Sequence, residues 1–357
     1  MRLAIDTHYF EEGFGGIQSF IEWILSDKVL EEIFKENDIE KYLFFYNRTV
    51  NFKDVKSENL NFLSKNNFPN TKISKISKSF KKIYWFFWFN FILPVRVKKY
   101  KIDIFLSPNH FLPLLKCAKE EVVVVHDFAW QINPKWKNLG YRIYAIFFQK
   151  MSLARANKIL VISQSTKKDL QKFYSVPENK IFLLKPKTRE IFKPRKKTDK
   201  KVKEVQKKYN LPQNFILFVG QIEERKNIPA LLEMINRLKN SKVKELINLK
   251  LVIVGNVGPG GKKYLNEIKN NKNILWFRNV VQDDLPYFYN LAKIFFMPSF
   301  YEGLCFPVLE AINSGIPVIT SNTSSFPEVI GNNGIMFSSN DYNSFCEAIK
   351  KKIIGKD

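Results

Sequence analysis

The stretch Phe215–Leu232, FILFVGQIEERKNIPALL, holds the features that decide the fold. Its first five residues are all apolar and lead to Gly220, a pattern typical of a strand that is covered on both faces of a parallel sheet. A short polar loop follows and carries Arg225 and Lys226 toward the next helical pattern. The stretch therefore predicts one strand–loop–helix unit of an α/β protein.

The same alternation continues on both sides of this unit. We expect further strands at 251–254, 274–277, 294–297, 318–320 and 335–337, and earlier ones at 3–5, 42–45, 104–106, 122–125, 159–162 and 181–184. Helical patterns lie between the strands, for example at 17–34 and 141–156. This order predicts two doubly wound, Rossmann-like domains.

The boundary between the two domains is marked by a change in composition. Residues 185–209 have little apolar material, and residues 193–208 contain nine basic and two acidic residues. We interpret this stretch as a linker followed by a solvated helix, and place the domains at 1–190 and 191–357. Because such sheets bind ligands at the carboxyl ends of their strands, we expect the two domains to face each other across a cleft that holds the site.

Composition limits the classes of function. The 357 residues are 45% apolar and 26% charged, which is ordinary for a globular chain, but their net charge of +24 favours anionic partners. The three cysteines are widely spaced, so we expect neither a disulfide scaffold nor a CxxC zinc site, and the usage suits a reducing compartment. With three histidines and no HExxH motif, we expect no protein-borne metal centre.

We expect neither an amino-terminal signal peptide nor a membrane-spanning helix. Acidic residues occur near the amino terminus, where a signal peptide would need an apolar run. The most apolar window, Ile83–Val95, has thirteen residues and is interrupted by Asn90, so it falls short of the ~20 residues that a bilayer requires. We therefore expect a cytoplasmic chain, or one that is peripheral at the inner face of the cell membrane.

A second informative stretch is Pro298–Gly315, PSFYEGLCFPVLEAINSG. Its pattern predicts a strand that ends near Met297, then a loop, and then a helix with Pro307 in the first turn. Free backbone N–H groups at such a helix start bind anionic or hydroxyl oxygens. The groups expected to do so belong to Gly303, Leu304, Cys305 and Phe306.

Two glutamates in this stretch, Glu302 and Glu310, are separated by seven residues. Carboxylates so placed suit the vicinal hydroxyls of a sugar ring and of a ribose. A pair of glutamates is more often a solvated face, but here the flanking apolar residues bury the helix. In the first stretch, the adjacent cations Arg225 and Lys226 suit a diphosphate, the alternative being a basic helix start.

Two loops are rich in glycine, and each follows a predicted strand. The loop after 251–254 carries Gly255, and the loop at 10–20 carries Gly15 and Gly16, where a glycine lets the backbone approach a ligand closely. Neither loop is a P-loop or a GxGxxG motif. His126 and Asp127 end a strongly apolar strand, which places them near the expected cleft or in a purely structural role.

In these motifs the chain resembles the retaining glycosyltransferases of family 4, which have the GT-B fold. The resemblance covers nearly the whole chain. It rests on GGIQSF, the HD pair after the fourth strand, KILVISQSTKKDLQKFY, FVGQIEERKN, LVIVGNVG, RNVVQDDLPYFYNLAKIFFMPS and EGLCFPVLEAINSGIPVITS. The spacing of Glu302 and Glu310 is the most specific of these features. The RKN form of the phosphate loop looks most like bacterial mannosyltransferases that build surface polysaccharides and lipopolysaccharide.

The resemblance implies roles for the donor site. Arg225 and Lys226 would hold the diphosphate of a nucleotide sugar beside Gly220 and Gly255. Glu302 and the amides after it would bind the sugar hydroxyls, and Glu310 would bind the ribose. The backbone at Asn279, Val280 and Val281 would face the base. GDP-mannose is the favoured donor.

The resemblance also implies roles for the first domain and for the reaction. Gly16, next to Gly15, would let that domain close over the phosphates, and His126 would contact the transferred sugar. The family transfers a hexose with retention, without metal or other cofactor, to a glycan or lipid-linked glycan acceptor.

The sequence departs from the family at two places. Gln221 stands where many relatives carry Arg, so Arg225 and Lys226 must meet the phosphate charge alone. Relatives also continue through further helices that pack back on the first domain, whereas this chain ends at Asp357. We therefore expect those C-terminal helices to be short or missing, with activity depending on whether the interdomain clasp is retained.

Residues 72–101 contain nine basic and no acidic residues together with nine aromatic ones. Two interpretations remain open: a core helix of the first domain with a basic solvent edge, or an interfacial helix that contacts an anionic membrane surface. A nucleic-acid-binding protein would also explain the charge, but not the Glu-bearing loops of two α/β domains, so we expect no nucleic-acid partner. Another enzyme on the same fold, such as a nucleotide-sugar epimerase or a phosphorylase, is the remaining alternative.

Overall fold

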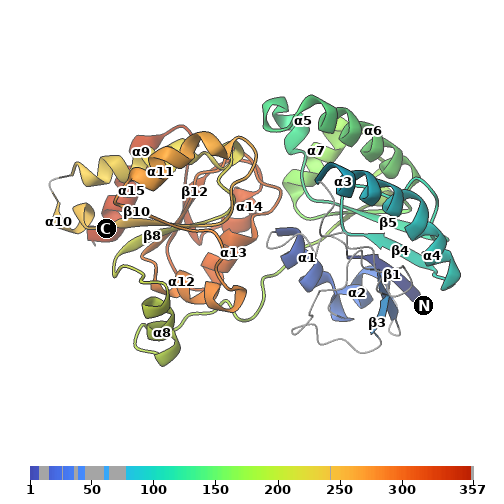
Figure 1. Cartoon of the computed structure of the whole chain (residues 1–357), viewed down its shortest axis with the longest axis horizontal. Coiled ribbons are helices and arrows are strands. Elements are labelled where there is room, and N and C mark those ends of the chain that lie inside the picture. Colours follow the sequence, from blue (N-terminus) through green and yellow to red (C-terminus); the bar gives the residue numbers. More distant parts are fainter. Residues whose placement is uncertain are drawn as a thin grey trace. The chain divides into compact units, whose positions relative to one another are not determined.

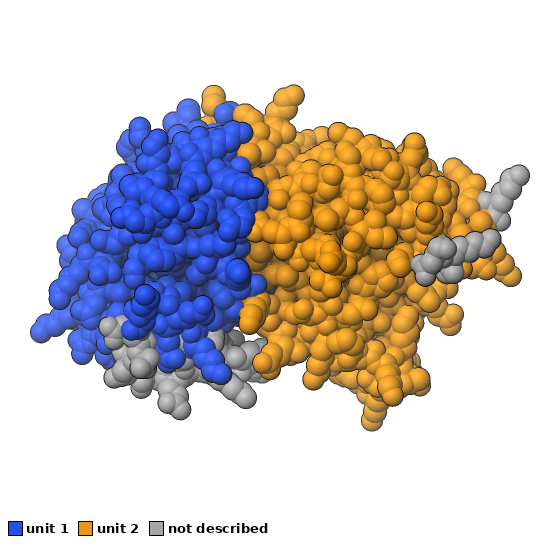
Figure 2. Space-filling view, turned by 180° about the vertical axis from the view of Figure 1, so that it is seen from behind, with its two compact units in different colours: residues 1–127, 140–186 blue, residues 128–139, 187–357 orange. Residues whose placement is uncertain are grey.

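The computed structural model describes residues 1–7, 16–25, 27–35, 39–44, 60–63, 78–241 and 243–354. The chain divides into two compact units, which Figure 2 shows in different colours. The first unit comprises Met1–Asp127 and Gly140–Pro186, and the second comprises Phe128–Leu139 and Lys187–Asp357. The segment Phe128–Leu139 thus belongs to the second unit, although the domain ranges drawn from the sequence assign it to the first.

The first unit is built on a seven-stranded sheet in which all the paired strands are parallel. The strand order is β3-β2-β1-β4-β5-β6-β7. Six strands lie where the apolar runs predicted them, and β3 is an addition, because four residues with a central Asn give too short a pattern. The strands are β1 (Arg2–Asp6), β2 (Glu40–Phe44), β3 (Leu60–Leu63), β4 (Ile104–Ser107), β5 (Glu120–Val125), β6 (Lys158–Val161) and β7 (Ile181–Leu183).

Helices cover both faces of this sheet, with α1 and α2 on one side and α3, α4 and α6 on the other (Figure 1). The helical pattern expected at 17–34 forms two helices rather than one, and the second begins at Asp27, a residue type favoured at helix starts. The helices are α1 (Gly16–Ile24), α2 (Asp27–Phe34), α3 (Lys78–Phe87), α4 (Leu93–Lys99), α6 (Leu139–Arg155) and α7 (Gln164–Phe173), with a 3₁₀ turn η5 at Glu178–Lys180.

The second unit is built on a six-stranded parallel sheet with the order β10-β9-β8-β11-β12-β13. All six strands coincide with expected apolar runs, and β8 and β11 are buried along their whole length. They are β8 (Phe215–Val219), β9 (Lys250–Val254), β10 (Ile274–Phe277), β11 (Ile294–Met297), β12 (Val318–Ser321) and β13 (Gly334–Phe337).

Helices cover the second sheet on both sides as well, with α9, α11 and α15 opposite α12 and α13 (Figure 1). The α-helices are α5 (Ala129–Ile132), α8 (Lys200–Lys208), α9 (Ile228–Lys239), α10 (Lys244–Ile247), α11 (Leu265–Asn270), α12 (Leu285–Leu291), α13 (Phe306–Asn313), α14 (Phe326–Ile330) and α15 (Tyr342–Ile354). The 3₁₀ turns are η4 (Pro134–Trp136), η6 (Glu224–Lys226), η7 (Gly261–Tyr264) and η8 (Gln282–Asp284).

The basic helix expected after the linker is α8, and it is solvated on one side only. Val202 and Val205 are buried against the second unit's core, while most of its lysines are exposed. At its end, Lys208 Nζ lies 2.6 Å and the Tyr209 hydroxyl 2.9 Å from a carboxylate oxygen of Asp284. These contacts anchor the linker to the turn that follows β10.

The strand orders place a topological switch point in each sheet. In the first sheet it lies between β1 and β4, and in the second between β8 and β11. Loops that leave neighbouring strands at a switch point diverge to opposite faces and open a crevice at the carboxyl edge. Both loops that carry the expected donor residues leave the second switch point, Arg225 after β8 and Glu302 after β11.

Residues 78–99 of the basic aromatic stretch form α3, a π-helical segment η3 (Trp88–Ile92) and α4 in one continuous run, and residues 72–77 lie outside the described residues. Asn90 explains the π segment, because its buried amide donates to the Phe86 carbonyl at 2.8 Å and its oxygen accepts from the Leu114 N–H at 3.0 Å. Pro94, four residues later, could not donate to Asn90 in a regular helix. None of the helices in the described part of the chain is long and apolar enough to cross a membrane.

Candidate functional site

The turn after β8 presents two cations from a short 3₁₀ segment, η6. Arg225 is half-buried and Lys226 is buried, with 8% of its surface exposed. Asn227 ends the turn in the left-handed conformation, at φ 53°, and donates its amide to the Ser339 carbonyl at 2.8 Å. A fixed turn of this kind holds both cations at the carboxyl edge of the sheet before α9 begins.

Glu302 lies between these two cations. Its Oε2 is 2.8 Å from Arg225 Nη1, and its Oε1 is 2.6 Å from Lys226 Nζ. Arg225 also binds Glu223 at 2.8 Å through Nη2 and the Tyr301 carbonyl at 2.8 Å through Nη1. The structure thus brings together three of the four residues on which the sequence-based hypothesis rests, and it adds Glu223, which the hypothesis did not include.

The charges within this cluster balance. Burial would raise the pKa of Glu302, but Arg225 and Lys226 outweigh burial and hold that pKa below its ordinary value. Glu302 is therefore ionised at neutral pH, as is expected for a carboxylate that bridges two cations. With Glu223 as the second carboxylate, two positive and two negative side chains meet at the carboxyl edge, and an incoming anion would compete with Glu302 for the cations.

A collar of hydroxyl side chains fixes the loop that carries Glu302. The Glu302 N–H donates to Ser324 Oγ at 2.8 Å, and the Ser325 hydroxyl donates to the Glu302 carbonyl at 3.1 Å. Thr323 donates to the Ser299 carbonyl at 3.1 Å from the same segment, and Ser321 binds that carbonyl as well. The sequence reasoning missed this collar, although a run of Ser and Thr directly after a buried strand was the available signal.

The start of α13 supplies backbone donors beside the cluster. The N–H groups of Leu304, Cys305 and Phe306 donate to no acceptor within the described residues, whereas the Val308 N–H binds the Cys305 carbonyl. Cys305 has φ 71°, a conformation that costs an L-residue about 1–2 kcal/mol. The strained residue turns the chain from the Glu302 loop into the helix, as predicted for the helix start, and burial raises the pKa of its thiol to about 12.

Glu310 has a different partner from the other three predicted residues. It is buried in the second turn of α13, and its Oε2 accepts from the Tyr289 hydroxyl of α12 at 2.6 Å. Burial and the neighbouring carboxylate raise the pKa of Tyr289 well above its usual range, so the phenol keeps the proton that it donates. Tyr289 is a further residue that the sequence pattern did not reveal.

The glycine after β9 has a structural reason to be glycine. A Cβ at Gly255 would lie 2.1 Å from the Gly220 carbonyl oxygen, so the loops after β8 and β9 touch backbone to backbone. At Gly220, a Cβ would approach Cε of Lys226 to 3.5 Å, which places this residue beside the buried ammonium group. Close packing of the loops therefore accounts for Gly255, and its expected contact with a nucleotide stays a prediction.

The turn expected to face a nucleotide base follows β10. Asn279 and Val281 are exposed there, and Val280 is buried. The Val281 N–H donates to the Tyr209 hydroxyl at 3.2 Å, so this backbone donor already has a partner. Contact with a base stays a prediction for this turn, and it would involve the remaining groups of Asn279 and Val280.

In the first unit, His126 follows β5 and is buried. Its Nε2 lies 2.6 Å from the Pro108 carbonyl, which can only accept, so Nε2 carries the proton and Nδ1 carries the lone pair. Burial lowers the pKa of His126 and keeps the ring neutral, although the Pro108 hydrogen bond and Asp127 oppose this shift. The ring packs edge-on against Phe20 of α1, with centroids 4.9 Å apart.

A second histidine, His110, completes this part of the carboxyl edge. It follows β4, is buried, and its ring centroid lies 5.6 Å from that of His126. Sequence reasoning missed it, although the NHF triplet after a buried strand was a signal of the same kind as the HD pair. Gly16 begins α1, as expected, and Gly15 lies outside the described residues. Among the described residues, no group of three or more His, Cys, Asp or Glu side chains is arranged to hold a metal ion.

Comparisons with known proteins assign this arrangement to a family. The model of Glycosyltransferase Family 4 matches residues 62–186, and that of Glycosyl transferases group 1 matches residues 199–356, so the two together cover most of both units. Each unit thus matches a glycosyltransferase model, and the chain is a glycosyltransferase. The second match contains the loops of Arg225 and Glu302, and the first contains His126.

Several relatives of this glycosyltransferase are bacterial mannosyltransferases. It is 29% identical over 261 residues to the O-antigen chain mannosyltransferase B of Escherichia coli, covering 72% of this chain and 67% of the relative. It is 28% identical to the serotype-specific mannosyltransferase WbdA of Escherichia coli over 65% of this chain, but spans only 29% of that longer protein.

The fold is also shared with solved structures. WaaG, a glycosyltransferase involved in lipopolysaccharide biosynthesis, superposes with a TM-score of 0.71 at 16% identity, covering 99% of this chain and 90% of WaaG. At that identity the likeness concerns the fold alone. The glycosyltransferase therefore has the GT-B fold of two Rossmann-like domains, as the sequence predicted.

Proposed function

We propose that this glycosyltransferase moves a hexose, with mannose favoured, from a nucleotide sugar to a glycan or lipid-linked glycan during the synthesis of a surface polysaccharide. The choice of mannose is supported by the names of its relatives, two of which are O-antigen or serotype-specific mannosyltransferases. GDP-mannose is accordingly the favoured donor.

One observation carries the proposal: a buried ammonium group, Lys226 Nζ, lies 2.6 Å from Glu302 in a loop that leads into α13. A buried cation beside free backbone N–H groups is suited to a diphosphate. When the diphosphate takes the place of Glu302 on Lys226 and Arg225, the released carboxylate is free to accept hydrogen bonds from the sugar hydroxyls. The unliganded ion pairs thereby keep the cations in position for the donor.

The proposed chemistry is charge stabilisation on the leaving group. As the bond between the sugar and the diphosphate breaks, negative charge grows on the phosphate oxygens, and Arg225, Lys226 and the N–H groups of Leu304–Phe306 face that charge. Donors positioned in advance stabilise this charge without rearrangement, and each lowers the activation barrier by roughly 2.7–4 kcal/mol. The leaving phosphate takes the proton of the acceptor hydroxyl, which attacks from the face that the phosphate vacates, so the anomeric configuration is retained.

Two further contacts complete the proposal. Glu310 would accept from the ribose hydroxyls, because its buried carboxylate stands in the second turn of α13, where the Tyr289 hydroxyl holds Oε2. Neutral His126 would accept a hydroxyl of the transferred sugar through Nδ1, because Nε2 already donates to Pro108. No step requires a metal ion or another cofactor, since the two cations and the amides meet the phosphate charge.

We place the reaction in the cytoplasm, at or near the inner face of the cell membrane. The cysteines Cys117, Cys305 and Cys346 are all unpaired and buried, which suits a reducing compartment. The net charge of +24 attracts an anionic donor. We propose no nucleic-acid partner, because such a partner would not explain the glutamates in the loops of the site.

A panel of ligands tests the donor assignment. If GDP-mannose is the donor, GDP should bind more tightly than UDP, ADP or dTDP and should raise the unfolding temperature more at equal concentration. A ligand at a hundred times its Kd adds about 2.7 kcal/mol of stability. Incubation with GDP-mannose and a mannose-containing oligosaccharide should then give a product whose new linkage is axial by NMR, as in the donor. An inverted linkage would overturn retention, and isomerisation of the nucleotide sugar without an acceptor would indicate an epimerase.

A further inference from the structure

The first unit has an apolar stripe on its surface that no part of the proposed reaction uses. Ile83, Phe87, Phe91 and Val95 follow one another at four-residue intervals along α3, η3 and α4, and their exposed fractions are 54%, 54%, 39% and 65%. The opposite side of the same run is buried, with Trp88, Phe89, Leu93 and Val97 in the core. The buried side chains are enough to hold these helices against the sheet. The exposed apolar side chains on the outer side contribute nothing to that packing.

Helix α6 extends the stripe sideways. Phe86 of α3 packs edge-on against Phe148 of α6, with ring centroids 6.0 Å apart, so the two helices are neighbours on one side of the sheet. Ile143 and Phe147 of α6 are each 63% exposed. We call this surface the apolar face, comprising Ile83, Phe87, Phe91, Val95, Ile143 and Phe147. Large apolar side chains gathered on adjacent helices are a signature of an interaction surface, whereas single ones are common.

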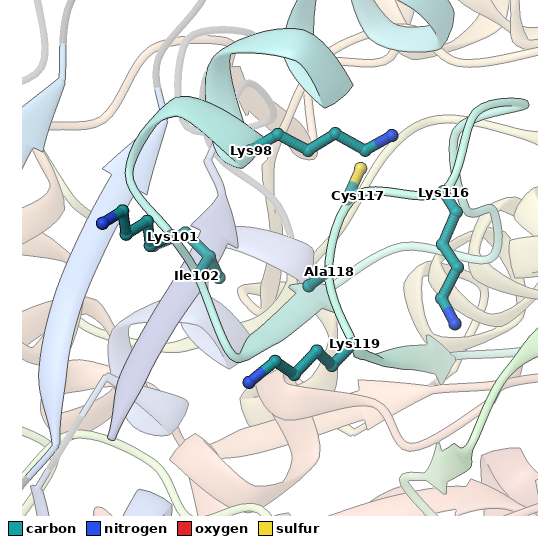
Figure 3. Close-up of a pocket in the computed structure, with 7 residues that line it drawn as sticks. All are labelled: Lys98, Lys101, Ile102, Lys116, Cys117, Ala118 and Lys119. Atoms are coloured by element: carbon teal, nitrogen blue, oxygen red, sulfur yellow. The ribbon is translucent and has the colours of Figure 1, made fainter.

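The apolar face ends in a cluster of lysines. One turn after Val95, α4 closes with Lys98 and Lys99, and a pocket of about 310 Å³ lies beside its end. Four lysines line the pocket, Lys98, Lys101, Lys116 and Lys119, around Ile102, Cys117 and Ala118 (Figure 3). The loop that carries Lys116 and Lys119 is tied to the helix run by the bond from the Leu114 N–H to Asn90.

This lysine pocket is poorly neutralised. Lys119 is 3.8 Å from Asp103 with its side chain 86% exposed, while Lys98, Lys101 and Lys116 form no ion pair among the described residues. Between residues 78 and 119 there are nine basic residues and one acidic residue, and α6 has three basic residues and no acidic one. The basic charge that borders the apolar face is therefore only partly compensated, with Asp103 as the one acid that pairs with a lysine of the pocket.

We propose that the apolar face and the lysine pocket together dock this glycosyltransferase onto a bilayer rich in anionic phospholipid. Apolar side chains would enter the boundary between headgroups and acyl chains, and the lysines would bind lipid phosphates. Charge complementarity decides for an anionic bilayer over a protein partner, since unpaired lysines beside exposed phenylalanines match a surface that offers phosphates above hydrocarbon. The face extends the basic aromatic stretch at 72–101 to α6 and to the loop before β5.

Flotation of the full chain with liposomes tests the docking. We expect binding to vesicles of phosphatidylcholine mixed with phosphatidylglycerol, little binding to pure phosphatidylcholine, and weakening by salt. Each lysine near the surface contributes ~1 kcal/mol, so removing one should lower the partition coefficient about fivefold. Lys98→Gln with Lys116→Gln should therefore lower it about twenty-five-fold, whereas Lys200→Gln with Lys203→Gln on α8 removes the same charge and should have little effect.

The apolar contribution is tested separately. Phe87→Ser with Phe147→Ser should reduce flotation even at low salt, whereas Phe182→Ser on β7, a residue 40% exposed, serves as the matched control. All three side chains are exposed, so the variants should keep the unfolding temperature of the parent. Equal binding by the variants and their controls would overturn the proposal. So would a loss of self-association in Phe87→Ser with Phe147→Ser, measured by sedimentation, without a loss of flotation, because the face would then join two copies of the chain.

Discussion

Lys226 and Glu302 form a buried ion pair, with Nζ and Oε1 2.6 Å apart. The two residues are distant in sequence and come from the loops after β8 and β11, the strands that flank the switch point of the second sheet. Removing one partner of such a pair leaves a buried charge alone, which costs about 3–5 kcal/mol. Any test of Lys226 must therefore separate its contribution to the fold from its contribution to the reaction.

Lys226→Met should lower turnover about 10²–10³-fold, because the leaving diphosphate loses one positioned cation. Glu302→Gln combined with Lys226→Met should recover much of the lost stability, since no uncompensated carboxylate remains on that side. Turnover should stay low in the double variant, because both Lys226 and Glu302 are proposed to bind the donor. Recovery of turnover together with stability would show that the lysine serves only to neutralise Glu302.

Cys305 offers a test of backbone strain at the start of α13. A residue at φ 71° is strained unless it is glycine, so Cys305→Gly should be more stable than Cys305→Ala by about 1 kcal/mol in urea unfolding. Ala311, in the regular part of the same helix, is the control: Ala311→Gly should lose about 1 kcal/mol. A Cys305→Gly variant no more stable than Cys305→Ala would mean that the loop relaxes around any residue.

The bond between Tyr289 and Glu310 separates nucleotide affinity from stability. Glu310→Gln should weaken the binding of nucleoside diphosphate, measured by titration calorimetry, more than it lowers turnover at saturating donor. Tyr289→Phe removes the phenolic donor from a buried carboxylate and should cost about 1–3 kcal/mol of unfolding free energy. Unchanged nucleoside diphosphate affinity in Glu310→Gln would remove the ribose assignment.

His126 should make the stability of the protein sensitive to acid. Its pKa is lowered by burial, so below an unfolded-state pKa of about 6.5 the unfolded chain binds a proton that the folded chain does not. Stability should therefore fall as the pH drops from that value toward the folded pKa, by at most about 1.4 kcal/mol per pH unit from this group. Urea unfolding of the parent and of His126→Asn at several pH values measures the effect, and parallel curves would contradict it.

Much of the fold could be predicted because its strands are buried on both faces. The residues of β8 and β11 are apolar throughout, and such runs identify a strand without knowledge of its neighbours. The same property indicated the candidate site, since a loop that follows such a strand starts at the carboxyl edge of the sheet. Arg225, Lys226 and Glu302 followed from that rule, and the structure places them in contact.

What the pattern did not predict depends on contacts between distant segments. The hydroxyl collar around Glu302 comes from the loop after β12, and the Tyr289 hydroxyl reaches Glu310 from another helix. The π-helical segment depends on the side chain of Asn90, which appeared in the sequence only as an interruption of an apolar window. Such pairings have no periodicity, so a reading of one sequence could not reveal them.

The segment Phe128–Leu139 has a consequence for how the protein can be divided. It belongs to the second unit, where the Phe128 N–H donates to the Tyr301 hydroxyl at 3.1 Å and Trp136 stacks on the Tyr301 ring. The polypeptide thus crosses from one unit to the other three times, and neither half is a continuous stretch of chain. A C-terminal fragment that begins at residue 191 would therefore lack Phe128 and Trp136, both of which contact Tyr301. After a protease cut in the linker, the second unit would be made of segments from both fragments.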